Sequence, residues 1–456
     1  MNLQELLKKV KEYEYVDMKI YDVNGTLRHV TLPSANVTQS TFEKGVGFDA
    51  SNFGYAHTSF SDMVAIPDVK TIFEEPFADD ETISFICDVW LPDRSKPFDW
   101  YPRNVLNKAL EYAQEIGVAT DMIVAPEMEF NLFNSLIHEV SPTSVLFKIE
   151  SDEISWPLSQ EPMIEADKGY HRIPPFDSMY DIRNEMVSIL TDLGMNVKYH
   201  HHEVGSSQFE IEFNLSSVKD AADWIPLLKY VVRNVAADNG YVASFLPKPM
   251  EGYAGNGMHV HQLLLNGKRN IFDDPSGLYS LSDVALSYIS GILKHAPALV
   301  AITNPSTNSY RRLVPGFEAP TKPIFALGNR NSAIRIPAYV SSKEERRIEF
   351  RIPDATSNSH FTMAAMLLAG IDGIKRKWDP RKEGLGPFEG DQVPTNVKDL
   401  PASLDEALNE LEKDHDFLLP AFPEELLQMW IKMKREEVRN ISKVPHPLEY
   451  KLYFGI

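Results

Sequence analysis

Two histidines stand on alternate positions directly after a glycine-rich turn, in the stretch AGNGMHVHQLL. The spacing of His259 and His261 is that of a β-strand, which turns both imidazoles to one face. Glu127 and Glu129, in PEMEF, repeat this spacing with carboxylates. Like charges on one face favour a bound cation, and imidazole nitrogens and carboxylate oxygens are both metal ligands. The two segments therefore predict a metal site.

Two further segments add carboxylates to this set. HHEVGSSQFEIEF contains Glu203 and a strand-like run in which Glu210 and Glu212 alternate with apolar residues, and RRIEFRIPD contains Glu349. Five of these carboxylates with one of the histidines form an oxygen-rich ligand set, which favours Mg²⁺ or Mn²⁺ over zinc. Each pattern alone also occurs on a half-exposed sheet, and a solvated edge strand is the alternative for PEMEF.

Enzymes that transfer phosphoryl groups combine hard cations with arginines, because both neutralise charge that grows in the transition state. The arginines in the relevant region are Arg311, Arg312, Arg330, Arg335, Arg347 and Arg351. The alternative for each is a surface ion pair. No Walker A loop and no Gly-x-Ser-x-Gly elbow is present, so a nucleotide would bind through another architecture, and acyl transfer through serine has no support.

Composition limits the classes of partner. The 456 residues carry a formal net charge of −20, which disfavours nucleic acids and anionic membranes. We expect no nucleic-acid partner and no membrane span, since no window reaches the apolar length of a spanning helix. The single cysteine, Cys87, excludes an intrachain disulfide and a cysteine-based zinc site, which favours a cytoplasmic protein.

The positions of turns and periodic segments predict two domains. VDMKIYDVNGTLRHVTLP reads as a hairpin around an Asn-Gly pair, and a proline-rich passage with Pro92, Pro97 and Pro102 follows the strand signals. We place the boundary there, with a small β-rich domain at 1–101 and a large domain at 102–456. A helix is predicted for RNVLNKALEYAQEIG, which has helical spacing and ends in glycine, and a strand is predicted for MIVAPEMEFNLF. The C-terminal tail is predicted to be mostly helical.

Seven motifs in this order resemble the type I glutamine synthetase family over nearly the whole chain. They are GFDASNFG, PEMEF, HHEV with QFEIEF, GNGMHVHQ, NPSTNSYRRLVPGFEAP, NRNSAIRIP and RRIEFRIPD. The resemblance implies an α+β fold with an N-terminal β-grasp domain and a catalytic domain built on a curved antiparallel sheet flanked by helices. It also implies a homo-oligomer, a dodecamer of two hexameric rings with active sites between neighbouring subunits.

The activity implied is the ATP-dependent ligation of ammonia to the γ-carboxylate of L-glutamate through γ-glutamyl phosphate, with two or more Mg²⁺ or Mn²⁺ ions in each site. By resemblance, one ion would be held by Glu129, Glu203 and Glu210. The other would be held by Glu127, His259 and Glu349.

The resemblance assigns the remaining roles as follows. Arg330 is catalytic with Glu318, a flap residue that closes the site and accepts a proton from the amine, and with Asp49, which a neighbouring subunit contributes. The substrate-binding residues implied are Glu129, Tyr170, Gly255, His259, Arg312 and Arg351. The ATP-binding residues implied are His261, Arg335, Lys343 and Arg347, of which Arg335 and Arg347, with Arg330, also carry phosphoryl charge.

Several positions depart from the usual family pattern. Asn52 and Ala254 alter the amine and glutamate pockets, Leu263 replaces a serine, Lys198 replaces a glutamate and Gly328 replaces an arginine. These departures leave open a γ-glutamyl-amine ligase that uses a polyamine or alkylamine. A catalytically silent scaffold protein is the alternative from another class, and the complete metal-ligand set argues against it.

Overall fold

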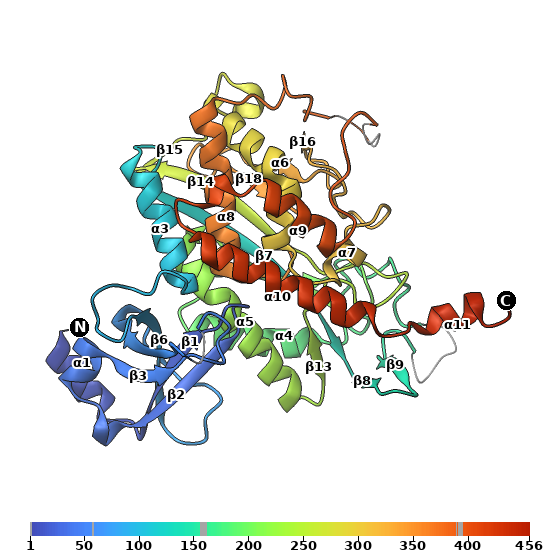
Figure 1. Ribbon diagram of the computed structural model, residues 1–456. Helices are drawn as coiled ribbons and strands as arrows, with labels where there is room; N and C mark the ends of the chain where they lie inside the picture. The colour runs from blue at the N-terminus through green and yellow to red at the C-terminus, as the bar shows by residue number, and fades with distance from the viewer. Residues whose placement is uncertain (1, 57–58, 156–161, 389, 391–394) are drawn as a thin grey trace.

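A computed structural model describes residues 2–56, 59–155, 162–388, 390 and 395–456 of the chain. A small N-terminal sheet lies beside a larger unit of sheet and helices, which gives the predicted α+β architecture (Figure 1). The two units share one continuous apolar core, to which Met18 and Val89 contribute from the first and Val260 and Leu367 from the second. The position of the large sheet is therefore fixed relative to the small one.

The N-terminal sheet has the strand order β2-β1-β6-β4-β3, with β5 on β6. Its elements are α1 (Leu3–Val10), β1 (Tyr15–Tyr21), β2 (Leu27–Pro33), α2 (Gln39–Lys44), β3 (Val46–Asp49), β4 (Asp62–Pro67), β5 (Phe73–Glu74) and β6 (Thr82–Trp90). The Asn-Gly pair lies in the turn between antiparallel β1 and β2, as predicted, and Gly25 has a φ of 79°. β1 also pairs with β6 in parallel.

The large sheet has the order β10-β11-β7-β14-β18-β17-β16, and all of these neighbours are antiparallel except β16 and β17. Short strands β12 and β13 pair with β7, and β15 pairs with β14. Its strands are β7 (Asp121–Phe133), β10 (Val197–His202), β11 (Gln208–Phe213), β12 (Ser216–Ser217), β13 (Val242–Ser244), β14 (Met258–Asn266), β15 (Arg269–Asn270), β16 (Phe325–Leu327), β17 (Ile334–Ile336) and β18 (Ile348–Phe350). A separate hairpin is formed by β8 (Ser135–Val140) and β9 (Val145–Glu150).

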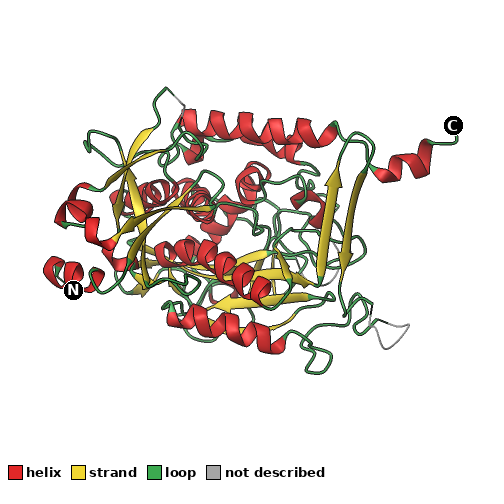
Figure 2. Ribbon diagram, turned by 90° about the horizontal axis from the view of Figure 1, so that it is seen from below, coloured by secondary structure: helices red, strands yellow, loops and turns green. Residues whose placement is uncertain are grey.

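The larger unit also contains helices, most of which lie around this sheet (Figure 2). They are α3 (Pro102–Glu115), α4 (Tyr180–Asp192), α5 (Val218–Asp238), α6 (Asp283–Thr303), α7 (Ser309–Arg312), α8 (Ser359–Arg376), α9 (Leu404–Lys413), α10 (Glu424–Ser442) and α11 (Pro447–Tyr453). The predicted helix after the proline-rich passage is α3, which has Pro102 in its first turn and is followed by Gly117 at a φ of 71°.

Helix α6 corrects one expectation from the sequence. Among the described residues it is the helix that is long and apolar enough to cross a membrane, and the sequence reading overlooked it. In the structure 83% of its apolar window is buried inside the protein. It packs so closely against α8 that a Cβ on Gly291 or Gly373 would collide with backbone atoms of the opposite helix. Its apolar character is thus accounted for by the core.

The C-terminal helix α11 extends away from the body of the protein in both ribbon views (Figures 1 and 2). None of its residues is buried, and the large apolar side chains Leu452, Tyr453 and Phe454 are 57%, 57% and 85% exposed. Large apolar side chains exposed together at the end of a helix are typical of a segment that contacts another chain.

Candidate active site

A cavity of about 840 Å³ opens beside the large sheet, a size suited to a small-molecule site. Most of the site residues predicted from the sequence line it: Glu127, Glu129, Tyr170, Glu203, Glu210, Gly255, His259, Arg312, Glu318, Arg330, Arg335, Glu349 and Arg351. The remaining four, Asp49, His261, Lys343 and Arg347, do not line it.

The carboxylates converge because β7 lies in the middle of the sheet, between β11 and β14. Glu127 lies opposite Glu212 on one side and His259 on the other, and Glu129 lies opposite Glu210. Directly opposed residues of paired strands project to the same face. The alternative of a solvated edge strand for PEMEF is therefore wrong, and both Glu129 and Glu210 are buried.

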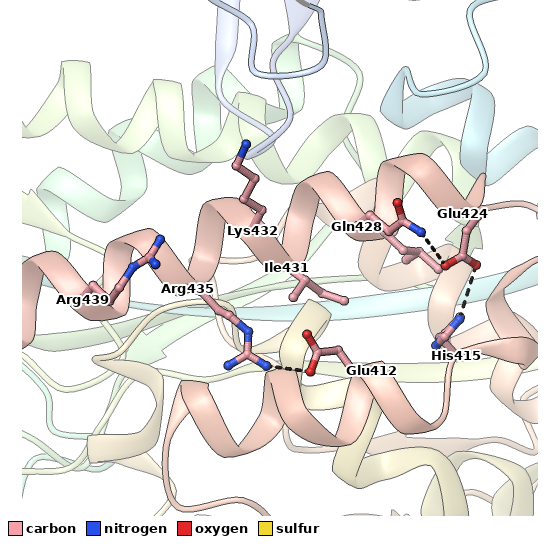
Figure 3. Close-up of a pocket in the computed structure, with 9 residues that line it drawn as sticks. Glu412, His415, Glu424, Gln428, Ile431, Lys432, Arg435 and Arg439 are labelled. Atoms are coloured by element: carbon pink, nitrogen blue, oxygen red, sulfur yellow. Dashed lines mark hydrogen bonds and ion pairs between the residues drawn. The ribbon is translucent and has the colours of Figure 1, made fainter.

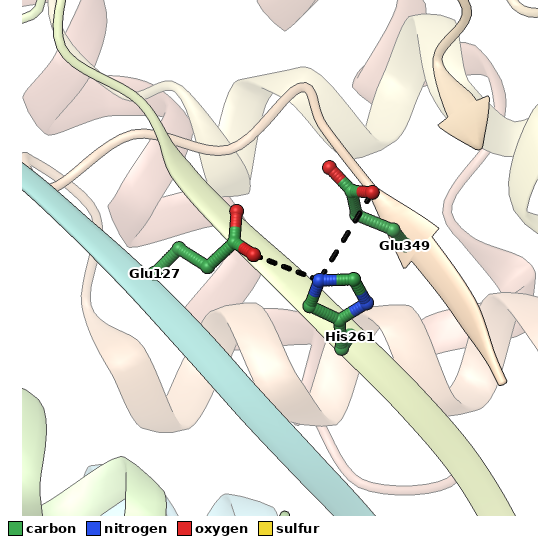
Figure 4. A group of neighbouring side chains, drawn as sticks. All are labelled: Glu127, His261 and Glu349. Atoms are coloured by element: carbon green, nitrogen blue, oxygen red, sulfur yellow. Dashed lines mark hydrogen bonds and ion pairs between the residues drawn. The ribbon is translucent and has the colours of Figure 1, made fainter. Parts of the chain in front are cut away.

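The potential ligand atoms form three groups, each with its atoms within 4.8 Å of one another. The first is Glu127, His261 and Glu349 (Figure 4), the second is His201, Glu203 and Glu210, and the third is Glu127, Glu210 and Glu212. The predicted pairs Glu127 with Glu349 and Glu203 with Glu210 thus lie together. The third members of these two groups are His261 and His201, where the resemblance implies His259 and Glu129.

His259 and His261 both contact Glu127 and differ in depth. His259 lines the cavity, with Nδ1 3.1 Å from Glu127 Oε2 and Nε2 3.7 Å from Glu129 Oε1. His261 Nε2 lies 2.8 Å from Glu127 Oε1, and Arg347 Nε donates to His261 Nδ1 at 3.3 Å. Because a guanidinium can only donate, that bond places the proton of neutral His261 on Nε2, facing Glu127.

The crowding of carboxylates changes their proton affinity. Burial, together with the charges of Glu127, Glu203 and Glu129, raises the pKa of Glu210 well above its usual range. Burial and the charge of Glu129 likewise raise the pKa of Glu203. Buried carboxylates that repel one another in this way fit divalent cations, which would relieve the repulsion through oxygen ligation. The donor set suits Mg²⁺ or Mn²⁺.

Arginines line the same cavity. Arg335 Nη1 and Arg351 Nη1 lie 2.5 Å from the two oxygens of Glu349. Burial alone would raise the pKa of Glu349, but the charge of Arg351 holds it at about 2. Arg312 donates to backbone oxygens that follow β18, including that of Ile352 at 2.8 Å. Guanidinium groups and carboxylates therefore lie next to one another in this cavity.

Tyr170, Glu318 and Arg330 meet at the exposed rim. Arg330 Nη2 donates to Tyr170 Oη at 3.3 Å, and Arg330 Nη1 lies 3.6 Å from Glu318 Oε2. Glu318 has a left-handed φ of 53° and follows Gly316, whose φ is 98°. A non-glycine residue in this region is uncommon, and such backbone is concentrated in functional segments.

Asp49 and Lys343 lie away from this cavity. Asp49, at the end of β3, is exposed, and its carboxylate accepts a hydrogen bond from the Ser51 N–H at 2.8 Å. Lys343 lines a separate cavity of about 950 Å³, together with Leu263. Arg347 lies beneath the active-site cavity with His261 and reaches Tyr339 Oη, which lines it, at 3.4 Å.

Another groove, between α9 and α10, contains no predicted site residue (Figure 3). Its charges pair locally, since Arg435 Nη2 lies 2.7 Å from Glu412 Oε2 and His415 Nε2 lies 3.3 Å from Glu424 Oε2. This pairing is consistent with a structural role in joining the two helices.

The sequence reading missed His201 as a possible ligand. The signal was present in HHHEV, because His201 and Glu203 are two residues apart at the end of β10. His201 Nε2 lies 3.2 Å from Glu210 Oε2. It also missed Tyr199 and Tyr339, which line the cavity with no motif to identify them.

Comparison with known proteins decides the family. Residues 12–92 match the description "Glutamine synthetase, beta-Grasp domain" and residues 99–453 match "Glutamine synthetase, catalytic domain". The chain belongs to the glutamine synthetase family, and it is an ATP-dependent ligase of that family. The family assignment and the fold predicted from the sequence are confirmed.

Three relatives illustrate the range of this family. Glutamine synthetase of Aquifex aeolicus is 40% identical, over 97% of this chain and 96% of its own. A protein named 3-hydroxylaminophenol mutase, from Cupriavidus pinatubonensis, is 38% identical over 100% of this chain and 99% of its own. The cryo-EM structure of Plasmodium falciparum glutamine synthetase superposes with a TM-score of 0.91 at 28% identity, covering 99% of each chain.

Proposed function

We propose that this glutamine synthetase family member joins ammonia to the γ-carboxylate of L-glutamate, using ATP and passing through γ-glutamyl phosphate, as in glutamine biosynthesis. The observation that carries the proposal is a single cavity lined by both carboxylates and arginines. Glutamine synthetases align with this chain over nearly its whole length, which supports the same reaction.

The cavity residues suit the first step, phosphorylation of a carboxylate. Two or more Mg²⁺ or Mn²⁺ ions, bound through Glu129, Glu203 and Glu210 and through Glu127, His259 and Glu349, would neutralise phosphate charge. Arg312 and Arg351 would bind the carboxylates of glutamate through charge-assisted hydrogen bonds. Arg330, Arg335 and Arg347 would stabilise the charge of the transferring phosphoryl group.

The rim residues suit the second step, attack by ammonia. Glu318 would accept a proton from the attacking amine, and its flap would exclude water that would otherwise hydrolyse the acyl phosphate. Tyr170 Oη lies beside Arg330 at the same rim and would border the ammonium pocket. His261 and Lys343 would lie toward the nucleotide.

We further propose a homododecamer of two hexameric rings. Two observations support assembly into some oligomer: the exposed apolar surface of α11, and the position of Asp49 outside the cavity of its own chain. We place the domain boundary between residues 101 and 102, where α3 begins, and we propose a cytoplasmic location on the basis of the single, buried cysteine.

A second candidate, a γ-glutamyl-amine ligase, is favoured by the small side chain at Ala254, which lines the cavity beside Gly255. It leaves space where a larger polar side chain would restrict the substrate. The relative named as a mutase also indicates that chains of this family can have other activities.

Phosphate release from ATP with Mg²⁺ and L-glutamate separates these candidates. Ammonium, a panel of alkylamines and polyamines, and no amine are compared, and the amide product is identified by mass spectrometry. Turnover with ammonium supports the proposed reaction. Turnover with an organic amine alone would replace it by the second candidate, and no turnover with any amine would contradict both.

A further inference from the structure

Lys198 brings a positive charge into the acidic wall of the cavity. Its Nζ lies 2.9 Å from Glu212 Oε2, and both residues line the cavity. The Glu212 side chain is only 7% exposed, whereas that of Lys198 is 30% exposed. Glu212 is also the third member of the carboxylate group that it forms with Glu127 and Glu210. The ammonium group thus contacts a carboxylate that otherwise belongs to a potential cation site.

A backbone irregularity in β10 accounts for the direction of this side chain. Val197 pairs with Phe213, and Tyr199 pairs with Glu212, so that Lys198 is an extra residue opposite β11. Regular alternation would turn Lys198 away from the face shared by Tyr199 and Glu212, whereas a bulge redirects a side chain. No motif in the sequence indicates such a bulge.

Tyr199 holds the ammonium in place. Lys198 Nζ donates to Tyr199 Oη at 3.2 Å and lies 4.4 Å from the centre of the same ring. An ammonium group next to a carboxylate, a phenol oxygen and an aromatic face loses less free energy on leaving water than an isolated ammonium group does. These contacts therefore fix the ion pair of Lys198 with Glu212 in the wall of the cavity.

The charge of the surrounding wall indicates a function for the ion pair of Lys198 with Glu212. Five carboxylates line this wall: Glu127, Glu129, Glu203, Glu210 and Glu212. Glu349 is paired separately with Arg335 and Arg351. Lys198 adds a positive charge to this wall beside the two divalent ions of the proposed function.

We propose that Lys198 is a built-in cation that occupies the place of a further divalent ion at the group Glu127, Glu210 and Glu212, and so limits the site to two ions. The inference rests on the proposed function for those two ions. Removing the ammonium would leave three carboxylates close enough to share an oxygen-bound cation, and two of them, Glu127 and Glu210, would also bind the other two ions.

The test counts Mn²⁺ bound to each chain of the full-length protein, without substrates, by electron paramagnetic resonance of free Mn²⁺. The wild type is expected to bind about two ions and Lys198→Met about three. Lys198→Arg, which retains the charge, should bind as many as the wild type. Lys413→Met is a matched control, because it removes an ammonium 3.1 Å from Glu410 on an exposed helix surface.

A double variant distinguishes the loss of the ammonium group from a folding defect in Lys198→Met. In Lys198→Met/Glu212→Gln the third carboxylate is neutral, and the count should return to about two. An equal count in the wild type and in Lys198→Met, or three ions in the wild type, would overturn the inference and leave the proposed function intact. A wild type that binds no Mn²⁺ would contradict the metal sites of the proposed function and, with them, the inference.

Discussion

His261 Nε2 lies 2.8 Å from Glu127 Oε1, deeper in the protein than the contact of His259 with the same carboxylate. Arg347 contacts the other nitrogen of His261, which keeps a proton directed at Glu127. His261 is thus arranged to orient the Glu127 carboxylate, while His259 faces the cavity as the proposed ligand.

This difference predicts unequal metal binding in two alanine variants. We expect His259→Ala, which removes a direct ligand, to weaken Mn²⁺ binding more than His261→Ala, whose loss affects an orienting contact and costs about 10-fold to 100-fold. Titration calorimetry with Mn²⁺ measures both affinities. The reverse order would assign the ligand role to His261, in the group with Glu127 and Glu349.

The strands and their faces could be predicted from the sequence because they depend on local periodicity. The alternation in PEMEF and HVH correctly placed Glu127 with Glu129 and His259 with His261 on β7 and β14. The order of strands depends on contacts between distant residues, and this is why burial of PEMEF at the centre of the sheet could not be distinguished from an edge. The direction of Lys198 depends on a bulge that no residue pattern marks.

Stability at low pH should depend on Glu349. Its pKa is about 2 in the folded chain and about 4.3 when unfolded, so its ionised form stabilises the fold above pH 4.3 and this contribution is lost as the pH falls toward 2. Glu349→Gln should therefore destabilise the metal-free protein at pH 6, with a difference from wild type that shrinks below pH 4.3.

Urea unfolding at several pH values, with both proteins at one concentration in the presence of a chelator, measures this difference. Glu412→Gln, on the surface of α9, is the control and should give a small difference at every pH. A constant destabilisation by Glu349→Gln down to pH 3 would show that lost packing, and not the ion pairs with Arg335 and Arg351, is responsible.

Loss of Glu318 should uncouple ATP use from amide formation. The residue lies at the exposed rim near Arg330, away from the carboxylate groups, so the first step should survive its removal. We expect Glu318→Ala to lower the rate of amide formation by about 10²-fold or more, with more phosphate released per amide. Glu318→Asp, which keeps a carboxylate, should retain more coupling than Glu318→Gln. An unchanged phosphate-to-amide ratio in the alanine variant would exclude the flap role.

The position of Asp49 predicts that active sites are shared between subunits. It is exposed on the N-terminal sheet and does not line the cavity of its own chain, whereas Arg330 does. Asp49→Asn and Arg330→Ala homo-oligomers should each be nearly inactive. In hybrids co-expressed in equal amounts, random assembly would place an intact Asp49 beside an intact Arg330 in about a quarter of the sites, and that share of the wild-type activity should return. If Asp49 acted within its own chain, every site would carry one defect and the hybrids, purified through a different tag on each variant, would stay inactive.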